Sequence, residues 1–244
     1  MSSRSARFAI LLLWNSAAFV VSLVSAFVLS PLVVRGLGIE AYGVWALVFS
    51  MLEYLNVVDL GIRSATVKYV ARHAALKEEA RLHGTLNASL IYFLGIALVL
   101  AAGVYFLAGL SVPFFHVPPA LGSDYILLLR LTGMTMAFQL LFNVPRAALE
   151  GIQDFPSVSR VNITVSAVRT TLCLLALHYK LGLGGLGWAT VAATWSGFLM
   201  LGWTFKRRFR GFTLSLRDFD LAIFRQLFHY GLPTVLGSLS GQFL

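Results

Sequence analysis

The 244-residue chain is too apolar for a soluble fold: 58% of its residues are hydrophobic, 12% are charged and its mean hydropathy is +0.81. A soluble domain carries about a quarter charged residues, so lipid must be the solvent for much of this surface. The net charge of +9 comes from basic residues in short segments between apolar runs. This pattern favours contact with anionic lipid headgroups over nucleic-acid binding. The single cysteine, Cys173, excludes an internal disulfide.

Six apolar runs are long enough to cross the hydrocarbon core of a bilayer, which takes about 20 helical residues. They cover residues 8–34, 43–62, 86–110, 125–144, 158–178 and 183–205. A further apolar stretch, residues 231–244, is too short to cross. The sequence therefore predicts an all-α, polytopic membrane helical bundle. We expect a six-helix transmembrane lobe over residues 1–205 and a truncated seventh transmembrane helix over residues 231–244.

The basic residues predict how these helices are oriented. If the amino terminus lies in the cytoplasm, most of the 19 lysines and arginines fall in cytoplasmic segments. The outer segments then hold only Arg35 and Lys180, while Arg130 and Arg169 lie within spans. Positive charge concentrates on the cytoplasmic side of membrane proteins, so we expect a multi-pass protein with a cytoplasmic amino terminus.

Residues 206–230 predict a basic amphipathic linker helix on the cytoplasmic surface, between the sixth and seventh spans. Its apolar residues recur at helical spacing: Leu216, Phe219, Ile223 and Leu227. Arg217 and Arg225 lie off this apolar face. We expect Gly231 and Pro233 to end the linker helix and to begin the next helix.

Polar residues occur within four of the runs, and in three of these runs they line up at 100° per residue. In the fourth run they share an arc of about 80°: Thr132, Thr135, Gln139, Asn143 and Arg146. In the fifth run the arc is about 100°: Ser159, Asn162, Ser166, Arg169, Thr170 and Cys173. The other two runs contribute Glu53, Asn56 and Asp59, and Asn15, Ser22 and Ser25. Such stripes indicate either close helix packing or the lining of an aqueous path.

Glu53 and Arg169 lie near mid-membrane, where a charged side chain costs about 2.5–3.5 kcal/mol. Two interpretations are open: the two residues neutralise each other, or they line an aqueous path in which Arg169 meets an anionic substrate group. Arg130 lies opposite the stripe of the fourth run, near the outer surface, which favours snorkelling to the headgroups. Asp59 lies at the cytoplasmic end of the second run, where we expect it to cap a turn or to pair with a nearby base.

Motifs of common enzymes are absent from the sequence, which has no P-loop, no G-x-S-x-G and no H-E-x-x-H. The five histidines are scattered over loops and span ends, so we expect no metal site. The sequence therefore favours a membrane transporter over an enzyme.

Four short segments carry a family resemblance. Residues 36–47 (GLGIEAYGVWAL), 59–62 (DLGI) and 68–71 (KYVA) resemble the polysaccharide biosynthesis membrane proteins. These are the O-antigen-type flippases of the multidrug/oligosaccharidyl-lipid/polysaccharide exporter superfamily. Residues 230–233 (YGLP), which open an apolar run after a basic linker, resemble the start of that family's second half. The chain is thus similar to the amino-terminal half of a lipid-linked oligosaccharide flippase.

The resemblance implies a MATE-like transporter of two lobes around a central cleft, of which this chain supplies one lobe. Such proteins move a polyprenyl-pyrophosphate-linked oligosaccharide across the bacterial cytoplasmic (inner) membrane by alternating access, for surface polysaccharides such as the O-antigen of lipopolysaccharide. The implied partners are the lipid bilayer, the lipid-linked oligosaccharide and other polysaccharide-assembly membrane proteins, with no nucleic acid. No cofactor is expected beyond coupling to Na⁺ or H⁺.

A pyrophosphate that crosses lipid needs cationic partners in a wet cleft, and its sugars need hydrogen-bonding groups. The hypothesis assigns substrate binding to these residues: Arg35, Arg169, Arg146, Asn15, Gln139, Asn143 and Asn162. It assigns the coupling ion to Glu53 and Asp59.

Three alternatives stay open at the level of the sequence. A multidrug or cation exporter of the same fold would favour acids over arginines in the cleft, and here both occur. An integral-membrane polysaccharide polymerase or ligase would need a large outer loop with a catalytic arginine or histidine, whereas loop 111–124 is short and has no arginine or lysine. The third alternative is a non-transporting scaffold or a defective fragment.

Overall fold

The computed structural model describes residues 2–54, 59, 61–212 and 221–240, and no strand occurs among these residues. The described part of the chain is therefore helical, as the apolar runs predict. Its helices are α1 (Ser2–Leu37), α2 (Ile39–Tyr54), α3 (Ile62–Leu76), α4 (Glu79–Phe114), α5 (Gly122–Gly151), α6 (Phe155–His178), α7 (Gly182–Arg208) and α8 (Leu221–Ser240). A short 3₁₀ turn, η2 (Pro119–Leu121), precedes α5.

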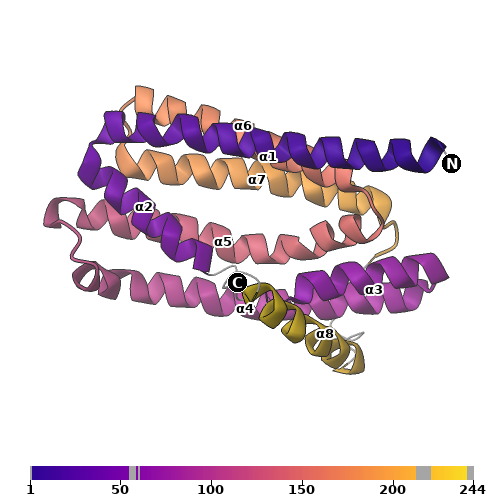
Figure 1. Ribbon diagram of the computed structural model, residues 1–244. Coiled ribbons are helices and arrows are strands. Elements are labelled where there is room, and N and C mark those ends of the chain that lie inside the picture. Colours follow the sequence, from indigo (N-terminus) through magenta and orange to yellow (C-terminus); the bar gives the residue numbers. More distant parts are fainter. Residues whose placement is uncertain (1, 55–58, 60, 213–220, 241–244) are drawn as a thin grey trace.

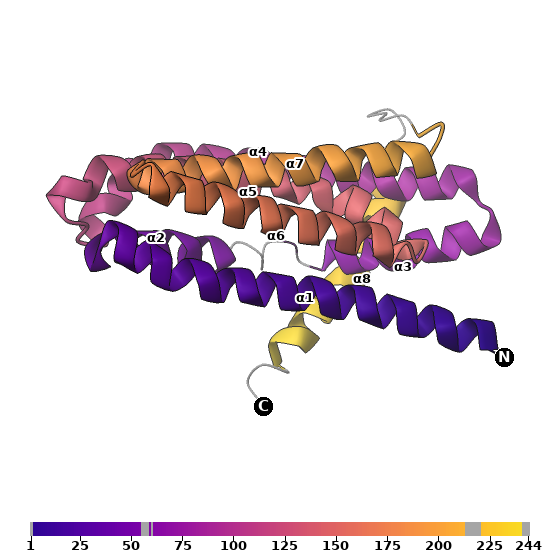
Figure 2. The same cartoon turned by 90° about the horizontal axis from the view of Figure 1, so that it is seen from above.

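The long helices lie side by side in a bundle (Figures 1 and 2). α4 packs along α5, and α6 packs along both α1 and α7. Because the turns between α4, α5, α6 and α7 are short, each of these helices runs opposite to the one before it. The amino-terminal end of the bundle therefore carries the α3–α4 and α5–α6 turns, and the opposite end carries the connections α1–α2, α4–α5 and α6–α7 (Figure 1).

Several of the helices are suited to a membrane. Segments long and apolar enough to span one are Ser16–Leu37, Glu79–Phe114, Pro119–Gly151 and Phe155–His178. A shorter apolar helix covers Ile39–Met51. The chain is therefore a multi-pass membrane protein, while the count of six spans and the start of a seventh stays a prediction.

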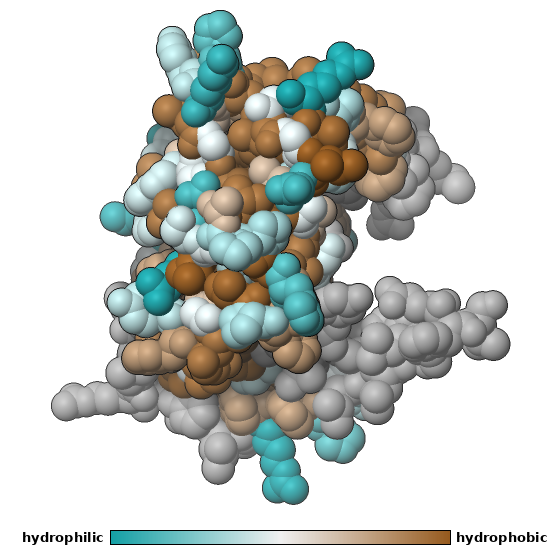
Figure 3. All heavy atoms as spheres, turned by 90° about the vertical axis from the view of Figure 1, so that its left-hand side faces the viewer, coloured by the Kyte–Doolittle hydropathy of each residue, from teal (hydrophilic) through white to brown (hydrophobic). Residues whose placement is uncertain are grey.

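Large apolar side chains lie on the outside of the bundle. Phe27 and Phe106 are each 74% exposed, and Leu199 is 72% exposed. Brown apolar surface also lies between scattered hydrophilic side chains at the opposite end of the bundle (Figure 3). Leaving such side chains in water forgoes about 1.5–3 kcal/mol each, so the exposed apolar side chains along the helices are suited to contact with lipid.

The second predicted run, residues 43–62, is not one helix, which corrects the sequence-based expectation. α2 ends at Tyr54, and α3 begins at Ile62 after Gly61, whose φ is 71°. A left-handed residue cannot continue a right-handed helix, and glycine adopts this conformation without a Cβ penalty. α2 alone rises about 24 Å, less than the hydrocarbon thickness of about 30 Å. Because the hydropathy of a residue does not depend on its backbone conformation, a continuous apolar run does not reveal that the helix ends within it.

The expected helix end at Gly231 and Pro233 is not observed, because α8 continues through both residues. The division into lobe, linker and seventh helix stays a prediction, and residues 213–220 of the linker lie outside the described residues. Leu227 is fully buried, and Ile223 packs against the same apolar cluster of α3, α4 and α5 residues. This apolar face of α8 therefore packs on protein.

Gly61 and Gly231 allow α3 and α8 to touch backbone to backbone. A Cβ on Gly61 would collide with the carbonyl oxygen of Gly231. Close by, Lys68 Nζ lies 3.6 Å from the centroid of the Tyr230 ring, in a cation–π contact. Described residues of the segments DLGI, KYVA and YGLP thus lie together in space, although YGLP is far from the other two in the sequence.

The turn between α3 and α4 leads to a prediction about acid stability. Nδ1 of His73 lies 2.8 Å from Oε2 of Glu78, and this hydrogen bond lowers the pKa of Glu78 below its usual 4.5, with help from the charge of Arg81. Since the folded pKa is below the unfolded one, the stabilisation is present above pH 4.5 and is lost as the pH falls through the lowered pKa. Glu78→Gln should therefore lose less Tm on acidification than the wild type, measured by thermal unfolding in detergent. Equal losses in the two proteins would contradict this, and Glu79→Gln is the control.

Candidate functional site

A cavity of about 440 Å³ lies between α1, α5, α6 and α7. Its volume is within the range of small-molecule sites, about 300–1,000 Å³. The polar part of its wall consists of Ser22, Gln139, Asn143, Arg146, Asn162, Ser166, Arg169 and Thr194. Phe142 and Phe198 also line it, with stacked rings 3.7 Å apart between centroids. The cavity therefore combines cationic, amide, hydroxyl and aromatic groups.

The polar stripes of the fourth and fifth predicted runs meet at this cavity. The predicted site residues that line it are Gln139, Asn143 and Arg146 from α5, and Asn162 and Arg169 from α6. α1 contacts α6 beside them, where the Oγ atoms of Ser22 and Ser166 lie 3.1 Å apart. The polar stripes of α5 and α6 could each be predicted from the sequence of one helix, and the packing of the two helices brings them together at the cavity.

Other members of the same stripes pack instead of lining the cavity. The Thr132 hydroxyl donates to the carbonyl of Leu128 at 2.6 Å, and the Thr135 hydroxyl donates to the carbonyl of Leu131 at 2.7 Å. Both threonines are buried. For these residues in the amino-terminal half of α5, helix packing is the role that the structure shows.

Arg169 presents an incompletely paired cation to the cavity. Its Nε is buried and has no hydrogen-bond partner among the described residues. A buried donor left unpaired costs about 1–3 kcal/mol, so the described residues do not fully satisfy this guanidinium. Both interpretations of Arg169 and Glu53, an ion pair or the lining of an aqueous path, stay predictions because the side chain of Glu53 lies outside the described residues. The side chain of Asn15 also lies outside them.

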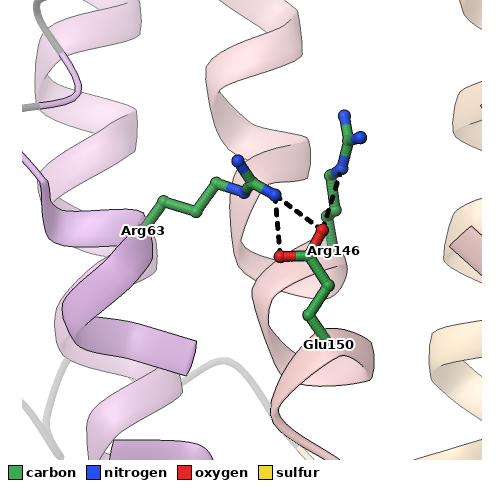
Figure 4. Close-up of polar contacts among 3 residues, drawn as sticks. All are labelled: Arg63, Arg146 and Glu150. Atoms are coloured by element: carbon green, nitrogen blue, oxygen red, sulfur yellow. Dashed lines mark hydrogen bonds and ion pairs between the residues drawn. The ribbon is translucent and has the colours of Figure 1, made fainter. Parts of the chain in front are cut away.

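Arg146 belongs to an ion network with Glu150 and Arg63 (Figure 4). Nη2 of Arg63 lies 2.6 and 2.7 Å from the two carboxylate oxygens of Glu150, and Nε of Arg146 lies 3.3 Å from Oε1. The Glu150 side chain is only 12% exposed, whereas those of Arg63 and Arg146 are about one-third exposed. Neither Arg63 nor Glu150 is among the sequence-predicted site residues. The sequence feature that could have identified Glu150 is its position four residues after Arg146, which places the two side chains on one face of the same helix.

The remaining predicted residues lie elsewhere. Arg35 is exposed in the last turn of α1, at the opposite end of the bundle. Oδ1 of Asp59 accepts a hydrogen bond from the backbone N–H of Arg63 at 3.0 Å, so Asp59 caps the first turn of α3, one of the two roles expected of it. The guanidinium of Arg130 lies 4.7 Å from the centroid of the Tyr105 ring on α4. None of the three lines the cavity.

The wall formed by α7 was not predicted from the sequence. It includes Thr194, Gly197 and Phe198. A Cβ on Gly197 would collide with the side chain of Val165, so this glycine allows α7 to approach α6 closely. Threonines and glycines in an apolar run are typical of packing, and only the position of α7 in the bundle places Thr194 and Gly197 at a cavity.

The chain forms a bundle of apolar helices with a polar cavity, and solved transporters of the MOP superfamily share this fold. A MATE in complex with MaD3S gives a TM-score of 0.80 at 19% identity, with 96% of this chain and 53% of that chain covered. An outward-facing multidrug resistance MATE family transporter gives 0.78 at 19% identity, with 96% and 52% covered. A MOP superfamily transporter from Pyrococcus furiosus, described by the reverse polarity of its binding pocket, gives 0.74 at 18% identity, with 96% and 52% covered.

The family follows from the sequence comparison. The model of the polysaccharide biosynthesis protein family matches residues 12–244, and the chain belongs to this family. The uncharacterized membrane protein EpsK of Bacillus subtilis (strain 168) is 23% identical over 227 residues, which cover 89% of this chain and 43% of EpsK. The resemblance carried by residues 36–71 and 230–233 is thereby confirmed. The chain spans about half the length of the relatives that it matches.

Proposed function

We propose that the protein is a flippase that moves a polyprenyl-pyrophosphate-linked oligosaccharide across the bacterial cytoplasmic membrane, by alternating access, for surface polysaccharide synthesis. The observation that carries this proposal is the charge of the cavity between α1, α5, α6 and α7. Of the described residues that line it, Arg146 and Arg169 are charged and none is acidic. Such a wall suits an anionic group.

The side chains of the cavity match the chemistry of a sugar pyrophosphate. Arginine presents its N–H donors in a planar fork that fits two phosphate oxygens at once. The amides of Gln139, Asn143 and Asn162 can each donate and accept, as sugar hydroxyls require. With the amino terminus in the cytoplasm, Arg146 lies toward the cytoplasmic side and Arg169 lies deeper. The two guanidiniums would then receive the pyrophosphate in turn.

A cavity of about 440 Å³ suits the headgroup of such a lipid rather than the whole molecule. The family members that this chain matches are about twice as long. In the proposal, their remaining half supplies the facing wall of the cleft. Glu53 and Asp59 remain the predicted sites for a coupling Na⁺ or H⁺, and Arg35 would be a further cation near the outer surface.

A multidrug exporter of the same fold is the second candidate, favoured by the likeness to MATE transporters. A cationic drug in this cavity would face two arginines and no described acid. Like charges at short range are unfavourable in a medium less polar than water. The charge of the wall therefore favours the anionic substrate.

Transport in proteoliposomes separates the two candidates. We expect the full-length protein to flip a fluorescent polyprenyl-pyrophosphate-linked disaccharide, detected by loss of fluorescence on adding a quencher outside the vesicles. The matched probe that lacks the pyrophosphate, and ethidium as a cationic drug, should not move faster than in empty vesicles. Protein-dependent ethidium movement without lipid flipping would replace the flippase by the drug exporter.

A further inference from the structure

We propose that Glu150 is a positioning residue of the substrate cavity. By holding Nε of Arg146, its carboxylate turns the two terminal nitrogens of that guanidinium toward a phosphate-bearing substrate. The proposal rests on the proposed function and adds to it a residue that does not itself contact the substrate. Arg63 completes the arrangement from α3.

The first observation is the direction of the Arg146 guanidinium. Its Nε lies 3.3 Å from Oε1 of Glu150, while its terminal nitrogens point away from the carboxylate (Figure 4). Arg146 lines the cavity, whereas Glu150 and Arg63 are not part of its wall. The edge of the guanidinium that is free of Glu150 is therefore the edge available to a ligand, and that edge can donate to two phosphate oxygens.

The second observation is the unequal sharing of Glu150. Arg63 contacts both carboxylate oxygens, at 2.6 and 2.7 Å, whereas Arg146 contacts only Oε1 and at a longer distance. Arg63 therefore neutralises most of the carboxylate charge. Two positive groups and one negative group leave a net positive charge, and it resides mainly on Arg146.

The third observation is the burial of the carboxylate. The Glu150 side chain is 12% exposed and lies one helical turn from Arg146 on α5, so the support is both short and fixed. A long side chain that is already ordered loses less freedom when it binds a ligand. For one such side chain this preorganisation corresponds to about a three- to tenfold gain in affinity.

Charge and positioning predict opposite effects of removing Glu150. If its charge alone mattered, the loss of a carboxylate beside an anion site would tighten anion binding. If Glu150 positions Arg146, its loss weakens binding although the site becomes more positive. Glu150→Gln also distinguishes the two effects. Its side-chain carbonyl oxygen can accept the hydrogen bond from Nε of Arg146 in place of Oε1, but the side chain carries no charge. Positioning therefore predicts near-normal binding, whereas charge alone predicts tighter binding.

The test uses the purified full-length protein in detergent micelles, titrated with farnesyl pyrophosphate and with farnesol as the neutral probe. We expect Glu150→Ala to weaken pyrophosphate binding about three- to tenfold and Glu150→Gln to stay near the wild-type affinity. Asp154→Ala is the matched control: its carboxylate is also 12% exposed, and it pairs with Arg208 at 3.0 Å at the same end of the bundle. This variant loses an ion pair but should bind normally.

Arg63→Ala provides a second route to the same answer if Glu150→Ala does not fold. It leaves Arg146 as the remaining partner of Glu150 among the described residues, so the carboxylate draws the guanidinium away from the ligand and binding weakens. Tighter or unchanged binding in Glu150→Ala or, if that variant does not fold, in Arg63→Ala, overturns the positioning role while the flippase proposal stands. A wild-type protein that does not distinguish farnesyl pyrophosphate from farnesol overturns both.

Discussion

Replacing Arg169 by alanine is expected to weaken farnesyl pyrophosphate binding by about 30-fold or more, and to remove most surface polysaccharide in cells that depend on the full-length protein. Arg169 lies on the cavity wall with a buried, unpaired Nε. Truncating one partner of a desolvated charged contact costs about 2–5 kcal/mol, and each 1.4 kcal/mol is about a tenfold change in affinity. Calorimetry of the purified protein and quantification of cell-surface polysaccharide measure the two effects.

Arg130→Ala is the matched control for this variant. Arg130 also lies in a predicted span and also has a buried Nε without a hydrogen-bond partner among the described residues, but it stacks on Tyr105 away from the cavity. It should bind and transport normally. Arg169→Lys keeps the charge without the planar fork and should be intermediate. If surface polysaccharide is undiminished in Arg169→Ala at normal protein level, the substrate role of Arg169 must be abandoned.

The second large effect is expected for Gly61→Ala, which should destabilise the protein by about 2–5 kcal/mol. A left-handed conformation costs a residue with a Cβ about 1–2 kcal/mol, and overpacking adds about 1–3 kcal/mol. Both apply at Gly61, where φ is 71° and a Cβ would collide with the carbonyl oxygen of Gly231. Unfolding of the purified protein in detergent, followed by loss of helical circular dichroism, measures the change.

Variants of two other glycines separate the conformational cost from the overpacking cost. Gly38 has a φ of 85° but open space around a Cβ, so Gly38→Ala should show the conformational cost alone. Gly43 lies within α2 with open space, and Gly43→Ala should be neutral or stabilising by about 0.5–1 kcal/mol. If Gly61→Ala costs no more than Gly38→Ala, the contact between α3 and α8 does not support the fold.

The half of the cavity formed by α5 and α6 could be predicted from the sequence. Asn143 and Arg146, and Asn162 and Arg169, each share one side of a helix, and a polar stripe within an apolar helix indicates a specific environment. Periodicity within one helix does not reveal which other helix faces the stripe. The contributions of Thr194 and Phe198 on α7 follow from helix packing alone.

The interactions between distant segments lay beyond the sequence for the same reason. Arg63 and Glu150 are 87 positions apart. Opposite charge alone does not identify them as partners, because many other pairs of acidic and basic residues in the chain also have opposite charges. The break at Gly61 was missed because an apolar run predicts solvent preference and not the backbone angle of one residue. Segments DLGI and YGLP were recognised separately, and their contact emerged only in the fold.

The first turn of α3 serves two neighbours at once. Gly61 touches the backbone of α8, and Arg63, two residues later, holds Glu150 on α5. Gly61 directly precedes the first residue of α3, so the contact with α8 and the contact with Glu150 lie at the same end of this helix. A movement of this end of α3 that follows a displaced α8 therefore shifts the support beneath Arg146. In this way a movement that begins outside the cavity reaches the cation that we assign to the substrate.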